Sequence, residues 1–266
     1  MTEEKANGNQ SLIRGLKLLD ILSNYPNGCP LAQLAETAEL NKSTVHRLLQ
    51  GLQQEGFIQP ATTAGSYRLT TKCLSIGHKM FSSLNIIHVA APYLEQLNLK
   101  TGETVNFSMR EDDHAIMIYK LEPTTGMLQT RAYIGQRLSL YCSGMGKLYL
   151  AYDKNSLDYL EKYWESHQEI IQPLTCNTIT DINAMQNELA EIKQQHFALD
   201  KEENEIGVTC IAYPIFNFKG EVKYSLSIST SVSRLHQIGT DFLHQEIKQT
   251  ALAISKELGW EKADFV

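Results

Sequence analysis

Three helix-length apolar patterns and two short strand patterns follow one another in residues 11–70, and this order limits the possible folds more than any other feature of the chain. The first helix is predicted by apolar residues at the i, i+4, i+7 spacing of one helical face, and it should end at the turn-forming segment 24–28. We expect the leucines of this repeat to be buried together; they are Leu12, Leu16, Leu19 and Leu22.

A second and a third helix are predicted after this turn. Pro30 suits the first position of the second helix, where its missing N–H costs nothing, and Ala35 and Ala38 would let another helix approach closely. Asn41 is predicted to cap the third helix through its side chain. The buried face of the third helix should be formed by Val45, Leu48, Leu49 and Leu52.

The opposite face of the third helix carries polar and basic side chains. These residue types can bind phosphates and base edges in the major groove of DNA while the helix packs by its other side. An ordinary solvated helix face is the alternative interpretation. The candidate DNA-binding residues on this face are Lys42, Ser43, Thr44, His46, Arg47 and Gln50.

Two short alternating runs, 57–61 and 66–70, predict a β-hairpin after Gly56. Three short helices followed by a small hairpin are typical of a winged helix-turn-helix, whose wing can lie along the DNA backbone. Arg68, in the second strand, is the candidate backbone contact. We therefore assign residues 10–72 to a DNA-binding domain.

The distribution of charge agrees with this assignment. The whole chain is acidic, with 24 Lys and Arg against 30 Asp and Glu, so it is not a general polyanion binder. Residues 40–72, in contrast, carry four basic side chains against Glu55 alone. A small cationic module on an anionic body suits local contact with nucleic acid.

The remaining chain is predicted to be a linker helix, residues 73–84, and a second domain, residues 85–260. Strands are expected near 103–109, 115–121, 207–216 and 222–230, and helices near 86–99, 144–152, 156–164, 182–196 and 242–258. Pro92 suits the start of a helix better than its middle. Because strands and helices do not alternate strictly, the fold class is α+β, with an antiparallel sheet flanked by helices.

Several classes of protein are disfavoured by missing patterns. No apolar stretch reaches the roughly 18 residues of a membrane span, and the polar start is unlike a signal peptide, so we expect a cytoplasmic protein. The eight histidines show no metal-binding motif, and we expect no metal or cofactor. The five cysteines show no paired spacing that would predict a disulfide framework; they are Cys29, Cys73, Cys142, Cys176 and Cys210.

Three segments of the second domain could bind a small polar or anionic molecule. Residues 142–147 form a glycine-containing turn into a helix, whose free amides attract a carboxylate. Residues 200–205 form an acidic loop ahead of a strand, which is more often a solvated charge run. Ser225, Ser227 and Ser229 alternate with apolar residues and so share one face of a strand, although such serines usually face solvent.

Five segments together resemble the IclR family of bacterial transcriptional regulators. In the first domain they are SLIRGLKLLDIL from Ser11, the run LAQLAETAELNKSTVHRLLQGLQQEGFI, and SYRL. In the second they are YCSGMGKLYLA and DKEENEIGVTCIAYPIF, so the resemblance extends from about Ser11 to Trp260. Within the family, the likeness is strongest to repressors of sugar-acid utilisation operons, such as those for diketogulonate or plant saccharides.

This resemblance implies a GAF-like α/β effector domain and a binding site. Met145 is bulkier than the small residue often found at its position, and Met127 and Leu128 would form an apolar wall. The effector would be a small carboxylate or sugar acid. The residues implied to bind it are Gly144, Met145, Asp200, Cys210, Ser227 and Ser229.

The predicted function is therefore a ligand-controlled transcriptional regulator that binds a pseudo-palindromic operator as a dimer or tetramer. One alternative is an enzyme that uses Cys210, Ser227 and Asp200, although no nucleophile-elbow or phosphate-loop motif is present. Another is a redox sensor based on Cys210 or Cys142. We do not expect an enzyme, because these motifs are missing. We do not expect a redox sensor, because the apolar strand around Cys210 should bury its thiol.

Overall fold

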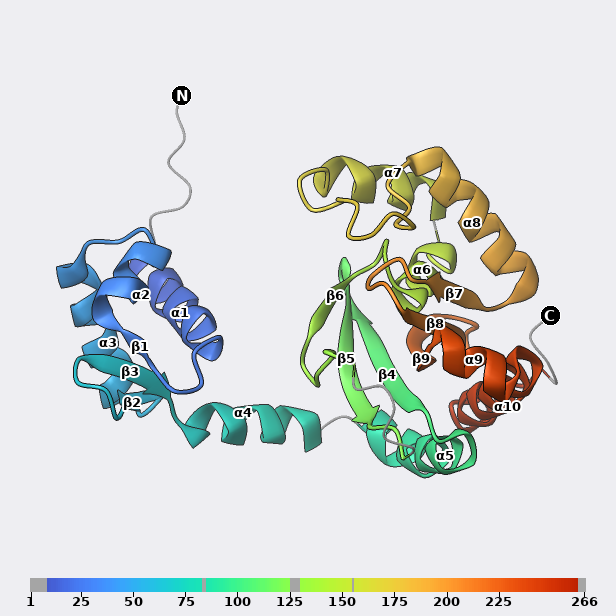
Figure 1. The fold of residues 1–266 in the computed structure, drawn as a ribbon, viewed down its shortest axis with the longest axis horizontal. Helices are drawn as coiled ribbons and strands as arrows, with labels where there is room; N and C mark the ends of the chain where they lie inside the picture. Colours follow the sequence, from blue (N-terminus) through green and yellow to red (C-terminus); the bar gives the residue numbers. More distant parts are fainter. Residues whose placement is uncertain (1–8, 83–84, 125–129, 155, 263–266) are drawn as a thin grey trace. The chain divides into compact units, whose positions relative to one another are not determined.

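The computed structural model describes residues 9–82, 85–124, 130–154 and 156–262. The chain divides into two compact units between residues 84 and 85. The N-terminal unit contains helices α1–α4 and a small sheet, and the C-terminal unit contains a larger sheet with helices on both faces (Figure 1). Each unit has its own hydrophobic core and is described separately below.

The N-terminal unit is a winged helix-turn-helix, as predicted. The hairpin strands pair antiparallel, and a short strand that the sequence patterns did not predict, β1, joins them in the order β1-β3-β2. The elements are α1 (Gln10–Ser23), β1 (Cys29–Pro30), α2 (Leu31–Thr37), α3 (Lys42–Gln54), β2 (Ile58–Pro60), β3 (Ser66–Leu69) and α4 (Thr71–Ser82).

The core of this unit corrects the predicted face of α1. Leu22 is buried as predicted and Leu19 is partly buried, but Leu12 and Leu16 are 54% and 53% exposed, and the buried place is taken by Leu18. Residues 15, 18 and 22 share the helical spacing that was also found at 12, 16 and 19, so the apolar run fits two faces equally well. The core selects the face of Leu18 and Leu22, which pack with Leu34, Val45 and Leu49.

Two predicted helix starts also differ in detail. Pro30 lies one position before α2, where its extended backbone pairs with Ser66 in the sheet. Asn41 does stand at the capping position of α3, but its side chain makes no capping hydrogen bond. Its backbone oxygen instead accepts from the Val45 amide at 3.1 Å. The start of α3 is therefore set by the backbone.

The C-terminal unit is built on a six-stranded antiparallel sheet in the order β6-β5-β4-β9-β8-β7. The two predicted pairs of long strands form its centre, and the short strands β6 and β7, which were not predicted, form its edges. The strands are β4 (Thr104–Glu111), β5 (His114–Leu121), β6 (Arg137–Ser139), β7 (Ala198–Lys201), β8 (Val208–Phe216) and β9 (Val222–Ser231).

Helices cover the two faces of this sheet in different ways (Figure 1). One face packs on α5 (Asn85–Thr101) and α10 (Thr240–Glu257), which contact the central strands. The other is covered by α6 (Gly144–Ala151), behind which lie α7 (Ser156–Ser166) and α8 (Ile182–Gln195). Because side chains alternate along a strand, each central strand contributes to both faces.

The two faces have opposite chemistry. The side facing α5 and α10 is apolar and almost completely buried, with Val105, Phe107, Ile211, Leu226 and Ile228. The side facing α6 is also buried but largely polar, with Asn106, Ser108, Ser225, Ser227 and Ser229. Serines on a strand face usually point to solvent. Ser225, Ser227 and Ser229 of β9 are buried instead.

Other differences from the sequence patterns concern helices. Pro92 lies inside α5, where it is exposed and leaves the packing of Ala90, Leu94 and Leu97 intact. The apolar pattern of the final helix predicts Phe242 among its apolar residues, but Phe242 is 40% exposed and Leu243 is buried in its place. A short helix, α9 (Val232–Ile238), was not predicted; it directly follows β9 and buries none of its residues.

Candidate DNA-binding surface and effector pocket

Helix α3 separates a buried apolar face from an exposed polar face. Val45 and Leu49 are fully buried in the core of the N-terminal unit. The candidate DNA-binding residues lie on the other side of the helix: Thr44 is half-buried, and Lys42, Ser43, His46, Arg47 and Gln50 are exposed. All six therefore lie on the side of α3 that faces away from the core.

The basic side chains of the N-terminal unit differ in their contacts within the protein. Lys42, Arg47 and Arg68 form no ion pair within the described part of the chain. Arg68 is exposed on β3, where its Nη2 and Nε lie 3.0 and 3.1 Å from the Gln59 amide oxygen when that amide faces it. Lys72, in contrast, donates to the Glu55 carbonyl at the end of α3 and lies 4.4 Å from the centroid of the Phe57 ring.

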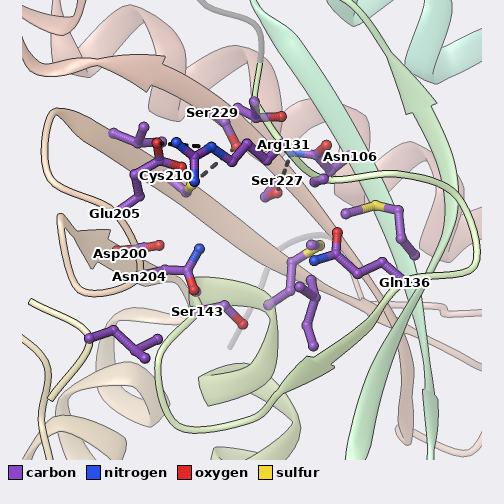
Figure 2. Close-up of a pocket in the computed structure, with 18 of the residues that line it drawn as sticks. Asn106, Arg131, Gln136, Ser143, Asp200, Asn204, Glu205, Cys210, Ser227 and Ser229 are labelled. Atoms are coloured by element: carbon purple, nitrogen blue, oxygen red, sulfur yellow. Dashed lines mark hydrogen bonds and ion pairs between the residues drawn. The ribbon is translucent and has the colours of Figure 1, made fainter. Parts of the chain in front are cut away.

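A cavity of about 470 Å³ lies on the polar face of the large sheet (Figure 2). Its wall is formed by β4, β5, β7, β8 and β9, by the start of α6, and by segments near residues 130–138, 174–175 and 204–206. The structure brings all six candidate effector-binding residues into this one wall, although they come from four different elements: Gly144, Met145, Asp200, Cys210, Ser227 and Ser229.

Two glycines allow α6 to begin against the sheet. A Cβ atom at Gly144 would lie 3.1 Å from the Ala212 Cβ, and one at Gly146 would lie 2.5 Å from the Leu140 oxygen. The Ser143 hydroxyl caps the helix by accepting from the Gly146 amide at 3.1 Å. The start of α6, with its unpaired amides and positive dipole end, therefore lines the cavity and can attract an anion.

Strand register sets the polar wall of the cavity. Asp200, Cys210 and Ser229 pair across β7, β8 and β9, and Ser227 pairs with Asn106 on β4. The Asn106 Nδ2 donates to the Ser229 hydroxyl at 2.9 Å and to the Ser227 hydroxyl at 3.4 Å. The Cys210 sulfur lies 3.1 Å from the Ser229 hydroxyl. These contacts form a continuous hydrogen-bonded row across three strands.

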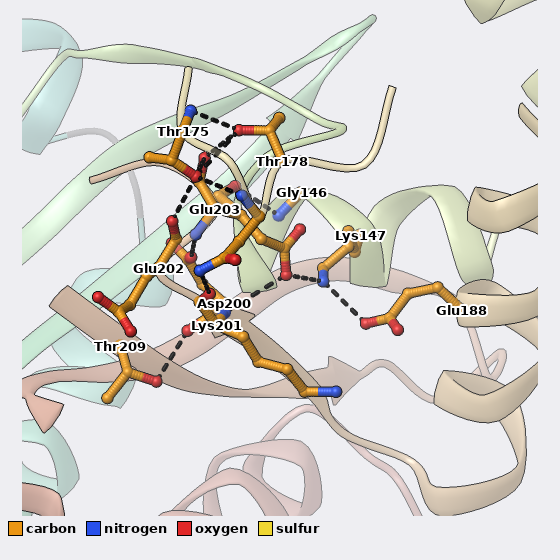
Figure 3. A network of polar contacts seen from close by, with 12 residues as sticks. Gly146, Lys147, Thr175, Thr178, Glu188, Asp200, Lys201, Glu202, Glu203 and Thr209 are labelled. Carbon is orange, nitrogen blue, oxygen red and sulfur yellow. Dashed lines mark hydrogen bonds and ion pairs between the residues drawn. The ribbon is translucent and has the colours of Figure 1, made fainter. Parts of the chain in front are cut away.

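A buried ionic network lies next to this wall (Figure 3). Lys147 of α6 is fully buried, and its Nζ donates to Glu203 at 2.6 Å and to Glu188 of α8 at 2.8 Å. Asp200 accepts from the Glu203 amide at 2.7 Å. Burial nevertheless raises the pKa of Asp200 to about 6, and the nearby Glu203 carboxylate contributes to this increase. The network joins the cavity wall to α6 and α8.

The redox alternative concerns two thiols, of which Cys142 is buried and Cys210 is partly buried. Burial raises the pKa of Cys142 to about 12 and also raises the pKa of Cys210. Both thiols are therefore protonated near neutral pH, and a protonated thiol is a poor nucleophile and a slow target for oxidants. Among the described residues, no group of three or more His, Cys, Asp or Glu side chains could hold a metal ion. No described helix is long and apolar enough to span a membrane.

The cavity also contains residues that sequence patterns missed. They include Asn106, Thr130, Arg131 and Gln136, whereas Asn204 belongs to the predicted segment 200–205. For Asn106 a signal was present, because Asn106 and Ser108 alternate with apolar residues on β4 just as the serines do on β9. No comparable pattern marks the loop residues. The predicted apolar wall of Met127 and Leu128 lies outside the described residues.

Known proteins resemble this chain over nearly its whole length. The IclR helix-turn-helix domain matches residues 11–61, and the C-terminal domain of the bacterial transcriptional regulator IclR matches residues 78–256. An uncharacterised HTH-type transcriptional regulator of Haemophilus influenzae is 67% identical, over 98% of this chain and 97% of that protein. The DNA-binding transcriptional repressor YiaJ of Escherichia coli is 63% identical, over 98% of this chain and 92% of that protein.

A solved structure supports the same assignment for the fold. The crystal structure of the Thermotoga maritima IclR aligns with a TM-score of 0.73 and 26% identity, covering 94% of this chain and 99% of that one. Matches to both domains, in the same order as in the relatives, account for the winged helix-turn-helix and for the sheet with its polar cavity. The chain therefore belongs to the IclR family of bacterial transcriptional regulators, which are DNA-binding proteins and not enzymes.

Proposed function

We propose that this regulator is a repressor that binds a pseudo-palindromic operator through α3 and the wing, and that a small hydroxylated carboxylate in the cavity controls this binding. The single observation that carries the effector part is the convergence of six residues from four elements on one cavity. Repression is supported by the likeness to YiaJ, which is named as a repressor.

The DNA-binding part rests on the exposed polar face of α3. Arg47 is exposed and forms no ion pair in the described structure, so its guanidinium is available to a guanine edge. We expect Arg47→Ala to weaken operator binding by about 1–3 kcal/mol, with a larger loss on the selected sequence than on random DNA. Operators would be selected from genomic fragments with the full-length protein, and affinities measured by fluorescence anisotropy at fixed salt.

Lys17→Ala is the matched control, because it removes one exposed positive charge from α1 rather than from α3. It should weaken binding far less than Arg47→Ala does. An equal loss for Arg47→Ala on every DNA sequence would make Arg47 a phosphate contact. No loss at all would refute the placement of α3 in the groove.

The effector part rests on the chemistry of the cavity wall. The α6 amides suit a carboxylate, and the hydroxyl and amide side chains of β4 and β9 suit hydroxyl groups, so the proposed class is sugar acids. Such acids would be screened with the full-length protein for an increase in melting temperature. An acid that stabilises the protein must also change its operator affinity, and operator DNA must change the affinity for that acid by the same factor.

Self-association and domain division complete the proposal. A pseudo-palindromic operator requires two DNA-binding units related by symmetry, so we expect dimers or tetramers in light scattering of the eluted protein. We propose residues 10–72, 73–84 and 85–260 as the DNA-binding domain, linker helix and effector domain, in a protein that works in the cytoplasm. Limited proteolysis should cut first within the proposed linker. A monomer on operator DNA would contradict the symmetric arrangement.

A further inference from the structure

One buried side chain in the cavity wall has a polar atom without a protein partner. Asn106 is only 3% exposed, and its Nδ2 is held by the hydroxyls of Ser227 and Ser229. Its Oδ1 is buried and has no hydrogen-bond partner within the described part of the chain. Thr130 lines the same cavity, and its hydroxyl oxygen is likewise buried without a hydrogen-bond partner in the described part of the chain.

An unpaired buried acceptor is costly, because it has lost its hydrogen bond to water without replacing it. Removing the Asn106 amide would also take away the donor of the Ser227 hydroxyl and one of the two hydrogen-bond partners of the Ser229 hydroxyl, whose other partner is the Cys210 sulfur. With its Nδ2 directed at the two serine hydroxyls, the amide presents its oxygen without a donor from the described part of the chain. The side chain is therefore preorganised to receive a donor from a molecule in the cavity.

We propose that Asn106, assisted by Thr130, is the residue that selects hydroxylated acids over unhydroxylated ones. This inference rests on the proposed function, since it concerns the same cavity. An ionised carboxylate and a ketone oxygen have no proton to donate to Oδ1, whereas a hydroxyl does. A short keto acid can occupy the α6 end of the cavity alone, but only a longer hydroxylated acid satisfies the Asn106 acceptor as well.

The test compares two kinds of probe on the full-length protein by isothermal titration calorimetry. The hydroxylated probes are the six-carbon acids D-gluconate, D-galactonate and L-gulonate, which differ in the stereochemistry of their hydroxyls. The short probe is pyruvate. We expect Asn106→Leu, which keeps the side-chain volume but removes the acceptor, to weaken the tightest-binding six-carbon acid by about tenfold or more and pyruvate by less than about twofold.

Two further variants distinguish a specific loss of acid binding from a general folding defect. Thr130→Val changes one oxygen to a methyl group and should weaken the same six-carbon acid by about threefold or more, with pyruvate again unaffected. Ser108→Ala is the matched control. Ser108 is buried two residues along β4 on the same face, but it binds Tyr149 and Ser225 and is absent from the cavity wall. It should leave the affinity for both kinds of probe unchanged.

The possible outcomes separate this inference from the function on which it rests. If Asn106→Leu weakens pyruvate and the six-carbon acid equally, or weakens neither, Asn106 does not select for hydroxyl groups, although the cavity still binds acids. If pyruvate binds the native protein and no six-carbon acid does, the inference is refuted in the same way. If none of the four acids binds, the proposed acid effector and the role of Asn106 are both wrong.

Discussion

The two faces of the six-stranded sheet are both buried, yet they are stabilised by different interactions. The face toward α5 and α10 is packed with aliphatic and aromatic side chains such as Phe107 and Leu226. The face toward α6 relies on hydrogen bonds and ion pairs, among them those of Tyr149 and Lys147. The apolar face can be explained by burial alone, whereas the polar face needs partners for each group. The two faces therefore follow different rules of stabilisation, and only the polar face lines the cavity to which we assign the effector.

The largest expected effect is on the polar face, at the buried ammonium group of Lys147. Lys147→Met would leave the buried Glu203 carboxylate and the half-buried Glu188 without their shared cation. Breaking a buried pair by removing one partner typically costs about 3–5 kcal/mol. We expect a loss of this size in the free energy of unfolding, measured by urea denaturation of the full-length protein at neutral pH.

The double variant Lys147→Met/Glu203→Gln serves as the control. It removes the unpaired charge as well as the cation, so it should regain a large part of the lost stability. A double variant as unstable as Lys147→Met alone would show that packing, and not charge compensation, holds this part of the polar face.

The next effect belongs to the apolar face. Leu226 is fully buried between β4 and β8 on the side of α10, and Leu226→Ala should lower the free energy of unfolding by about 2–5 kcal/mol. The relative affinities for six-carbon acids and pyruvate should not change, because the side chain points away from the cavity. Calorimetry under conditions where the variant is folded checks this. A change in acid preference would mean that the two faces are coupled.

The smallest predicted effect is at Asp200, where a substitution should raise the free energy of unfolding, by an amount that depends on pH. The pKa of Asp200 is raised from 3.8 to about 6, so the folded state holds a proton more tightly than the unfolded state between these values. Ionised Asp200 therefore costs stability above pH 6, and this cost disappears as the pH falls below about 4.

Asp200→Asn should consequently stabilise the ligand-free protein by about 1–3 kcal/mol at pH 7.5, since the amide keeps an acceptor for Glu203 and carries no charge. The gain should shrink toward zero near pH 4. Urea denaturation at pH 4, 6 and 7.5 gives the comparison. If the variant were less stable than the native protein at pH 7.5, ionised Asp200 would be a net stabiliser of the polar face.

Sequence patterns predicted the longer elements because these contain enough residues for a period to be counted. All four central strands and the helices of the winged helix-turn-helix were found in this way. The short strands β6 and β7 have three and four residues, too few to show alternation. The buried face of α1 could not be chosen from the pattern, because Leu16 and Leu18 each belong to an equally good apolar repeat. Only the docking of α2 and α3 decides between them.

The candidate site was predictable to a similar degree. The glycine turn before α6 and the alternating serines on β9 are local patterns, and the family resemblance indicated how they combine. The position of Asn106 depends on the register between β4 and β9, which pairs it with Ser227 over a separation of 121 residues. Loop residues such as Thr130 and Arg131 reach the cavity through tertiary contacts that no local pattern encodes. The inner wall was therefore more accessible to sequence reasoning than the rim.

The alternation along β9 has a consequence for how such a protein can change over time. Ser227 and Ser229, which line the cavity, are interleaved with Leu226 and Ile228 of the apolar face, so neighbouring codons specify the cavity wall and the core packing in turn. Under the proposed function, exchanges at positions 227 and 229 would alter which metabolite is sensed while the hydrophobic layer stays intact. Evolution, or a designer of biosensors, could thus retune the proposed response by exchanging a few side chains on β9. The apolar residues on the other face of this strand would keep it in the sheet.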